Sequence, residues 1–276
     1  MLLLLFFLLL ILLLLVFYIW AILPNFGRKT DCLHYADWSY AHRGLWDMDL
    51  QIPENSLPAF SRAVESGFAI ELDVHLTKDK QLVVFHDDTL KRMCQLDEKV
   101  EEMTYDQISR YALKGTDYCA PLLPEVLELV NGRVPLLIEM KLPTRDLSLC
   151  PVLASLLDSY TGNYMIESFQ PFGLRWFRKN RPEVLRGQLS ARYKPSEPPA
   201  LPLKIASTEL LLNWISRPDF IAYNYRHYGS LGSILNARLF RTPYWVWTIR
   251  SEKAYATCKK RFDGVIFEKM LPEIPT

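Results

Sequence analysis

The first 24 residues of this chain contain no acidic or basic side chain. At a rise of about 1.5 Å per residue, a helix of this length can cross the ~30 Å hydrocarbon core of a membrane. The stretch also lacks the basic residues that open a signal peptide, because its first basic residues, Arg28 and Lys29, follow it. We therefore predict that residues 1–24 are an uncleaved transmembrane anchor, with a cleaved signal peptide as the alternative.

Cysteine is scarce, and the five cysteines present, an odd number, form no C-x-x-C pair. This spacing argues against a disulfide framework and a zinc knuckle, and it is typical of a reducing compartment. Arg28 and Lys29 lie on the C-terminal flank of the apolar stretch, which favours the cytoplasmic side for that flank. We expect a single-pass membrane protein whose larger part faces the cytoplasm.

Strong charge of either sign is also missing, since the formal net charge is only +1. Together with the absence of a basic run interleaved with aromatic residues, this balance predicts no nucleic acid partner. The chain has no internal repeat and no G-x-G-x-x-G turn at the start of a helix, which counts against an open nucleotide-binding sheet.

After a predicted linker at residues 25–36, strand-like and helix-like segments alternate through one predicted catalytic domain at residues 37–272. About eight such units predict a closed TIM (β/α)₈ barrel, with an open doubly wound sheet as the alternative. Residues 88–121 interrupt the alternation and are expected to cross the barrel mouth. The strand candidates are Ser39–His42, Phe68–His75, Gln81–His86 (an extra strand), Leu136–Lys141, Tyr164–Phe169, Val184–Leu189, Phe220–Tyr225, Tyr244–Ile249 and Gly264–Phe267. The helix candidates are Ser56–Ser66, Pro124–Asn131, Leu147–Tyr160, Pro171–Asn180, Thr208–Ser216, Ser230–Arg238 and Glu252–Arg261, and the Pro-rich run at 194–199 is expected to be a loop.

Acidic side chains stand near the ends of two of these apolar strands: Glu71, Asp73 and Glu139. Residues two apart share one face of a strand, and the carboxyl ends of barrel strands meet at the mouth. Three converging carboxylates repel one another unless a cation lies among them, and oxygen ligands suit Mg²⁺ or Ca²⁺ better than zinc. We predict one divalent cation at these three residues. The alternative for each is an ion pair with a lysine.

Histidine and cationic side chains end the same group of strands. His42 and His86 are the predicted proton-transfer groups, because imidazole gains and loses a proton near neutral pH; the alternative is a structural histidine. Arg43 and Lys141 are predicted to bind phosphate oxygens. Their alternative is ion pairing to the carboxylates of the metal site.

Three further residues are expected in or behind the site. Asn55 precedes the helix expected near Ser56, so it caps that helix, contacts the site, or does both. His75 shares the face of the strand carboxylates and is expected to lie behind them. Trp247 faces the same way as Trp245 and is the better candidate for a pocket wall.

In order along the chain, these residues resemble the glycerophosphodiester phosphodiesterase family. The resemblance covers roughly residues 38–272. The matching motifs are His42-Arg43-Gly44, Pro53-Glu54-Asn55-Ser56, Glu71-Leu72-Asp73-Val74, Val84-Phe85-His86-Asp87-Asp88-Thr89-Leu90, Glu139-Met140-Lys141, Ser168-Phe169 and Phe262-Asp263-Gly264-Val265-Ile266.

The resemblance implies a TIM-barrel hydrolase that splits glycerophosphodiesters into an alcohol and glycerol 3-phosphate with the help of a divalent cation. Departures from the family pattern at Ile249-Arg250 and Phe267-Glu268-Lys269 touch the rim of the mouth and leave substrate preference open. The implied roles are metal binding by Glu71, Asp73 and Glu139, acid and base catalysis by His42 and His86, and phosphate binding by Arg43 and Lys141.

A site held near a bilayer also meets lipids. Lysophospholipids, cut by lysophospholipase D action, and glycerophospho-N-acylethanolamines are therefore alternative substrates. Leu45, Trp46 and residues 88–121 are the candidates for the apolar rim that an acyl chain requires. Inositol-lipid cleavage on the same barrel is a further alternative. A non-catalytic phospholipid-binding barrel is less favoured, because every expected carboxylate and histidine is present.

Overall fold

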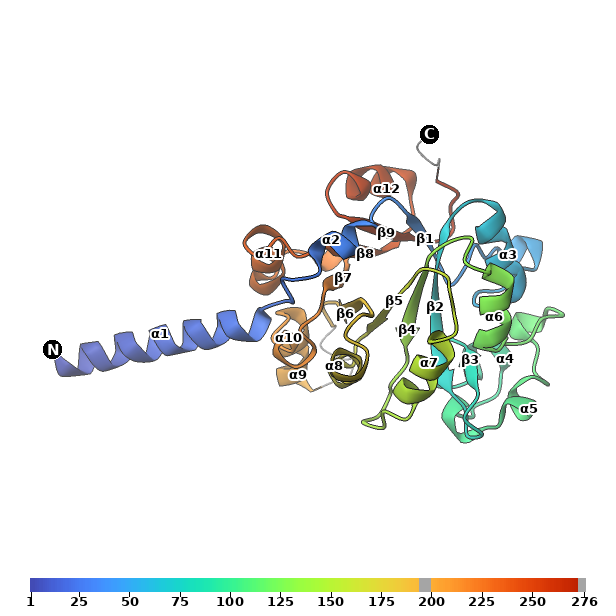
Figure 1. The fold of residues 1–276 in the computed structure, drawn as a ribbon, viewed down its shortest axis with the longest axis horizontal. Helices are drawn as coiled ribbons and strands as arrows, with labels where there is room; N and C mark the ends of the chain where they lie inside the picture. Colours follow the sequence, from blue (N-terminus) through green and yellow to red (C-terminus); the bar gives the residue numbers. More distant parts are fainter. Residues whose placement is uncertain (194–199, 273–276) are drawn as a thin grey trace.

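Eight parallel strands form a closed barrel in the computed structural model, which describes residues 1–193 and 200–272 (Figure 1). β1 pairs with both β2 and β9, and these pairings close the sheet. The predicted TIM barrel is therefore confirmed. Its strands are β1 Ser39–His42, β2 Ala69–Leu76, β4 Leu136–Met140, β5 Tyr164–Ser168, β6 Arg186–Ser190, β7 Phe220–Asn224, β8 Tyr244–Ile249 and β9 Gly264–Phe267.

The extra strand predicted after β2 is also present. β3 (Leu82–Val84) runs antiparallel to the end of β2, beyond the point where β1 stops. The chain then forms a small lobe with its own apolar core, which includes Phe85, Met93 and Ile108. Its short elements are α4 Lys91–Cys94, η2 Val100–Glu102, α5 Tyr105–Ile108 and η3 Leu113–Gly115.

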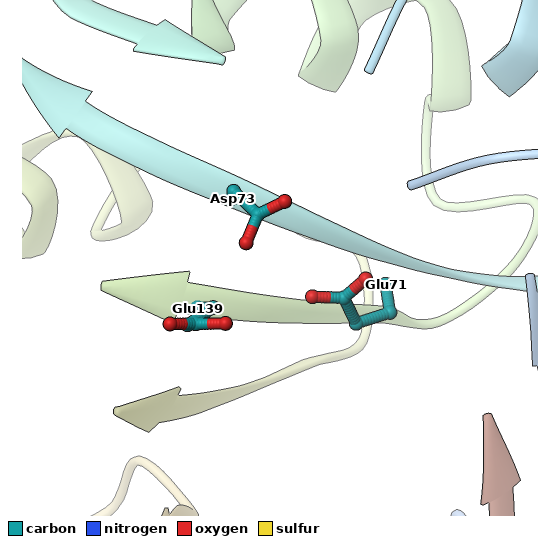
Figure 2. A group of neighbouring side chains, drawn as sticks. All are labelled: Glu71, Asp73 and Glu139. Carbon is teal, nitrogen blue, oxygen red and sulfur yellow. The ribbon is translucent and has the colours of Figure 1, made fainter. Parts of the chain in front are cut away.

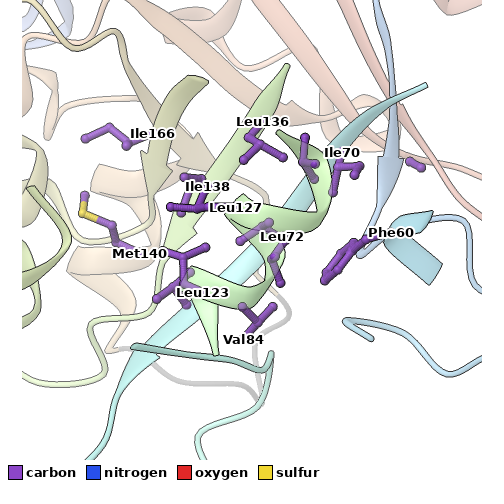
Figure 3. Packing of buried hydrophobic residues seen from close by; sticks show 14 of the residues in the cluster. Phe60, Ile70, Leu72, Val84, Leu123, Leu127, Leu136, Ile138, Met140 and Ile166 are labelled. Carbon is purple, nitrogen blue, oxygen red and sulfur yellow. The ribbon is translucent and has the colours of Figure 1, made fainter. Parts of the chain in front are cut away.

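Helices cover the outside of the barrel because alternate strand residues point outward and are apolar. Ile70 and Leu72 of β2 and Leu136 and Ile138 of β4 pack there against helix α6, as Figure 3 shows. The covering helices are α3 Leu57–Glu65, α6 Leu123–Val130, α7 Leu149–Leu157, α8 Pro171–Asn180, α9 Leu201–Thr208, α10 Asn213–Ser216, α11 Leu231–Arg238 and α12 Glu252–Lys259, with η1 Met48–Leu50 and η4 Tyr225–His227 in connecting loops.

One local prediction was wrong, and one of the alternatives for Asn55 is excluded. The helix expected at Thr208–Ser216 is divided, because the backbone at Leu210 adopts φ 59°, which an α-helix cannot continue through. The N-cap of α3 is Ser56, whose hydroxyl accepts a hydrogen bond from the Ala59 amide, and not Asn55. The Pro-rich run at 194–199 lies outside the described residues.

The interior of the barrel has two layers. Apolar side chains form a floor in its lower part. In six of the strands, the residue two positions after the floor residue belongs to a second layer, which is largely polar. The floor residues of these strands are Tyr40, Ala69, Leu137, Met165, Trp245 and Ile266, and the residues above them are His42, Glu71, Glu139, Glu167, Trp247 and Glu268. The charged layer therefore rests on packed hydrocarbon, which blocks access from below.

Helix α1 (Leu2–Ile22) projects away from the barrel (Figure 1) and is long and apolar enough, by length and composition, to cross a membrane. Only its last residues are buried, at Ala21 and Ile22. Residues 25–36, expected to be a linker, contain the short helix α2 (Lys29–Leu33), whose Cys32 is buried against the barrel floor. The chain between α1 and β1 is thus part of the packed structure.

We expect Gly187→Ala to destabilise the protein, because a Cβ atom at Gly187 would lie 2.2 Å from the Phe220 ring in the barrel floor. Overpacking of this kind lowers the free energy of unfolding by about 1–3 kcal/mol. Urea denaturation of the full chain in detergent would measure the loss. The matched control is Gly27→Ala, whose Cβ would meet only Asn25 at 3.8 Å. Equal stability of the two variants would contradict this packing.

Candidate active site at the barrel mouth

Three carboxylates converge at the carboxyl end of the barrel. Glu71 and Asp73 extend from β2 and Glu139 from the neighbouring β4, and Asp73 and Glu139 are paired directly in register (Figure 2). One oxygen of each lies within 4.8 Å of an oxygen of the others, and all three residues are buried. This all-oxygen group could hold a metal ion.

The balance of charge supports that reading. Burial, and then the charges of Asp73 and other carboxylates, raise the pKa of Glu71 well above its usual value. Burial opposes ionisation of Asp73 too, but Lys141, His86 and Arg43 hold the pKa of Asp73 well below its usual value. These carboxyls are too crowded to ionise together without further positive charge, which a divalent cation could supply.

Lys141 supplies part of the compensation. Its ammonium nitrogen lies 2.8 Å from Oδ1 of Asp73 and 2.7 Å from Oε1 of Glu139. Burial alone would lower the pKa of Lys141, but the two carboxylates raise it. The structure therefore places Lys141 in an ion-pair position against the carboxylates, the alternative recognised for it in the sequence.

A fourth carboxylate, Glu167, was missed by the sequence analysis. It occupies the next position around the barrel, paired in register with Glu139, and its Oε2 atom is buried without a hydrogen-bond partner among the described residues. Burial and the charges of Glu139 and Asp73 raise the pKa of Glu167 well above its usual value. The signal was available, because Glu167 directly follows the apolar residues Tyr164, Met165 and Ile166.

His42 is held by a carboxylate from the last strand of the barrel. Its Nδ1 lies 2.5 Å from Oε2 of Glu268, and Glu268 also accepts a hydrogen bond from Arg250. Since an ionised carboxylate can only accept, Nδ1 of His42 carries the proton and Nε2, 3.9 Å from Glu71, is the free atom. Burial opposes ionisation of Glu268, but the His42 and Arg250 contacts lower its pKa to about 2.

His86 is held in the same way from a different part of the chain. Its Nδ1 lies 2.6 Å from Oδ1 of Asp87, and Arg92 donates to the other oxygen of Asp87. Arg92 also donates two hydrogen bonds to Glu54, whose carboxylate accepts a third from Arg43. At each histidine, Nδ1 is therefore bound to a carboxylate, and that carboxylate is bound to an arginine. Nε2 is the ring nitrogen that remains for proton transfer.

A tight turn after β1 sets the position of Arg43. Arg43 has φ 61° and Gly44 has φ 81°, and a Cβ atom at Gly44 would lie 2.9 Å from Cβ of Ala59. The turn directs the Arg43 amide to a Glu71 side-chain oxygen at 3.0 Å. Asn55 completes this corner by donating from Nδ2 to Oδ2 of Asp73 at 2.8 Å.

His75 and Trp247 lie behind and beside the carboxylates. His75 is fully buried, its Nε2 donates to the His86 carbonyl at 3.4 Å, and burial lowers its pKa to about 4, so it is neutral at pH 7. Trp247 packs edge-on against Phe169, with ring centroids 5.9 Å apart. Phe169 in turn lines a cleft beside Glu139.

Two clefts flank the carboxylates. A cleft of about 740 Å³ lies beside His42 and Arg43, and a second of about 410 Å³ lies beside His86 and Glu139. The larger cleft has both charged and apolar walls. The two kinds of side chain meet where the Lys269 ammonium lies 5.3 Å from the centre of the Trp46 ring. Its apolar lining residues are Leu45, Trp46, Met48, Met93, Met270 and Leu271.

We expect Lys141→Met to destabilise the metal-free protein, because it leaves Asp73 and Glu139 buried without their ammonium partner. Loss of one partner of a buried ion pair costs about 3–5 kcal/mol of unfolding free energy. Thermal unfolding in EDTA should show the loss, and saturating divalent cation should restore part of it. The exposed Lys253→Met is the control. A loss unaffected by metal would contradict the assigned charge balance.

Residues 42–271 match the glycerophosphoryl diester phosphodiesterase family. A glycerophosphodiester phosphodiesterase from Bacillus altitudinis is 40% identical over 110 residues, which cover 37% of this chain and 44% of the relative. A lysophospholipase D from Rattus norvegicus is 39% identical over 101 residues, which cover 32% of this chain and 31% of the relative. The matches thus span less than two thirds of the length of these curated relatives.

Solved structures agree over a larger part of the chain. A glycerophosphodiester phosphodiesterase from Thermotoga maritima superimposes with a TM-score of 0.64 at 26% identity, covering 83% of this chain and 93% of its own. An Oleispira antarctica phosphodiesterase, solved in complex with its product sn-glycerol-3-phosphate, shares the fold with a TM-score of 0.66 at 22% identity, covering 83% and 92%. The conserved barrel and the match over residues 42–271 lead to one conclusion: the chain belongs to the glycerophosphoryl diester phosphodiesterase family.

Proposed function

We propose that this protein hydrolyses glycerophosphodiesters to an alcohol and glycerol 3-phosphate. The observation that carries the proposal is the convergence of three buried carboxylates with two histidines, each held at Nδ1 by its own carboxylate, at one end of the barrel. Membership of the family supports the same reaction class.

The donor set favours a hard divalent cation, Mg²⁺ or Ca²⁺, at Glu71, Asp73 and Glu139. Such an ion, when bound, stabilises the negative charge that develops on a non-bridging phosphate oxygen. Lys141 and Arg43 border the same carboxylates, so they are the proposed contacts for the remaining phosphate oxygens. Asn55 orients Asp73 through its amide hydrogen bond.

The two histidines are proposed to share the proton transfers. In the hydrolytic direction, Nε2 of one imidazole takes a proton from the nucleophile as the new P–O bond forms. The other imidazole, protonated at Nε2, gives its proton to the departing alkoxide as the old P–O bond breaks. Burial lowers the pKa of His42, which favours the neutral imidazole and hence the role of base for His42.

Two nucleophiles satisfy this scheme. Water attack yields glycerol 3-phosphate and the alcohol in one displacement. Attack by the glycerol 2-hydroxyl of the substrate first yields a cyclic phosphate, which water then opens. Either route uses one base and one acid, so the positions of His42 and His86 serve both.

A second substrate class is favoured by the larger cleft. Its charged wall at His42 and Arg43 is continuous with apolar side chains that include Leu45 and Trp46, as an acylated glycerophosphodiester requires. The lysophospholipase D relative supports this candidate. Lysophospholipids and glycerophospho-N-acylethanolamines are therefore proposed alongside soluble diesters.

We also propose that α1 is retained as a single-pass membrane anchor, with the barrel on the cytoplasmic side. The carbonyl of Ile22 accepts hydrogen bonds from Asn213 and Asn236, both at 3.1 Å, so the end of α1 is built into the domain. Removal of the helix as a signal peptide would expose these buried amides. Arg28 and Lys29 after α1 support the cytoplasmic orientation.

The substrate test uses the full chain in detergent with glycerophosphocholine and lysophosphatidylcholine side by side, each with EDTA, Mg²⁺ or Ca²⁺. We expect metal-dependent choline release, with glycerol 3-phosphate from the first substrate and lysophosphatidic acid from the second. Exchange of Glu139 for Gln should abolish release and bound metal together. No turnover of either substrate by the metal-loaded protein would overturn the proposed function and favour a binding module.

His42→Ala and Glu268→Gln separate the chemical from the orienting role. Loss of a proton-transfer group costs about 10²–10⁴-fold in rate, so we expect that drop in kcat for His42→Ala. Glu268→Gln should lower kcat less and leave KM nearly unchanged, because it only releases Nδ1 of His42. Wild-type kcat in His42→Ala would show that His42 is not the base, and wild-type kcat in Glu268→Gln would show that Glu268 does not orient it.

The fate of α1 is tested by the intact mass of the protein purified from membranes. Retention predicts a mass that includes residues 1–22 and resistance of the protein to extraction by alkaline carbonate. Replacement of Asn213 and Asn236 with Leu should loosen the end of α1, observed as faster hydrogen exchange at Ala21 and Ile22. A mature chain that begins after Ile22 would identify a signal peptide.

A further inference from the structure

Exposed apolar side chains gather on the part of the barrel from which α1 projects. Figure 1 shows α11 on one side of the α1 junction and α10 and α9 on the other. On α9, Leu201, Leu203 and Ile205 are 68%, 52% and 51% exposed. The docking face, as we name it, comprises Leu201, Leu203, Ile205, Trp214, Leu231 and Leu239.

This face is joined to α1 by direct contacts. The Tyr18 hydroxyl donates to Oε2 of Glu209, at the end of α9, at 2.9 Å. Trp20 stacks on Trp214 of α10 with ring centroids 5.6 Å apart. Since α11 also contacts the end of α1 through Asn236, all three helices are fixed relative to α1.

A group of guanidinium side chains borders the same junction. Arg217 lies 5.2 Å from the centre of the Trp20 ring and donates to the carbonyls of Trp20 and Leu23. Burial and the neighbouring charge of Arg178 lower the pKa of Arg217, and burial and Arg175 do the same for Arg178. Arg175, Arg178 and Arg217 take part in no ion pair among the described residues. Their positive charge is therefore available to anionic groups.

We propose that the docking face lies on the surface of the lipid bilayer that α1 enters. The proposal rests on the proposed anchor. A bilayer is favoured over a protein partner because α1 leaves this face as a helix whose apolar side chains are exposed from Leu2 to Phe17. Apolar residues around such a helix gain by burial at the interface, and the arginines beside it attract anionic headgroups.

This arrangement brings the mouth of the barrel close to lipid. Ser190, at the carboxyl end of β6, donates to the carbonyl of Ser207 in α9 at 2.7 Å, so α9 lies at the mouth end. Tyr193, three residues after Ser190, is hydrogen-bonded to Ser207 as well, so the segment that leaves β6 joins α9 to the mouth. An acylated substrate in the membrane therefore has a short path to the carboxylates, which deepens the second substrate class proposed above.

The test measures the depth of nitroxide labels on the full chain in nanodiscs that contain phosphatidylcholine and phosphatidylserine. Labels are attached at Leu203→Cys or Leu239→Cys after the half-buried Cys94 and Cys119 are replaced with Ser. The matched control is Glu128→Cys on α6, an exposed position on another part of the barrel. We expect the ratio of collisions with oxygen to collisions with an aqueous nickel chelate to rise several-fold at both test positions over the control.

Equal ratios at all three positions would overturn the proposal, as would dipolar broadening between labels, which would assign the face to a second copy of the chain. This measurement does not depend on turnover, so it fails independently of the proposed function. Substrate delivery has its own test in the triple variant Leu201→Ser, Leu203→Ser and Ile205→Ser. Its turnover of lysophosphatidylcholine in bilayers should fall several-fold while turnover of glycerophosphocholine is unchanged; equal rates with wild type for both would refute delivery across this face.

Discussion

Repulsion among buried carboxylates is the constraint around which the mouth of this barrel is organised. Glu71, Asp73, Glu139 and Glu167 occupy one stretch of the interior, where low water content makes each uncompensated charge expensive. Lys141 is the ammonium placed directly against them, and it contacts two of the four. The remaining imbalance of charge favours a divalent cation, so the proposed metal site has its origin in the same crowding that would otherwise destabilise the fold.

The two histidines show how the barrel orients groups drawn from distant parts of the chain. His42 depends on Glu268 of the last strand segment, whereas His86 depends on its immediate neighbour Asp87. Arg92 connects the His86 side to Glu54 and thereby to Arg43 on the other side of the carboxylates. Ion pairs therefore link His86 to Arg43, while Glu268 and Arg250 hold His42 separately, so both imidazoles are oriented by the same chemical means.

The sequence was informative wherever a periodic pattern determined the outcome. The alternation of residues in β2 and β4 places Glu71, Asp73 and Glu139 on one face, and no contact across the barrel is needed to infer this. The partnership of Glu268 with His42 was inaccessible, since it exists only after the last strand pairs with the first. The pairing of Arg92 with Asp87 and Glu54 was inaccessible as well, because Arg92 belongs to the lobe that follows β3. No periodic pattern specifies the path of this lobe over the mouth.

Other differences arose from competition between local and tertiary interactions. Asn55 is a good capping residue, yet its amide is bound by Asp73, and Ser56 caps α3 in its place. Residues 25–36 have a polar, linker-like composition, but Cys32 fills the bottom of the barrel and fixes the segment. At Asn55 a contact with the site takes the place of a local cap, and at residues 25–36 burial against the barrel fixes a segment whose composition predicted a linker.

The hydrogen bond between His42 and Glu268 joins residues that are synthesised at different times, because the chain is made from its N-terminus. A ribosome has released every residue of the carboxylate group, together with Lys141, when barely half of the barrel exists. Glu268 directly follows β9, so it is synthesised after every other strand of the barrel and after α1. The nascent protein thus acquires its proposed metal ligands early and an aligned His42 only when β9 reaches β1, which makes the proposed chemistry dependent on closure of the barrel.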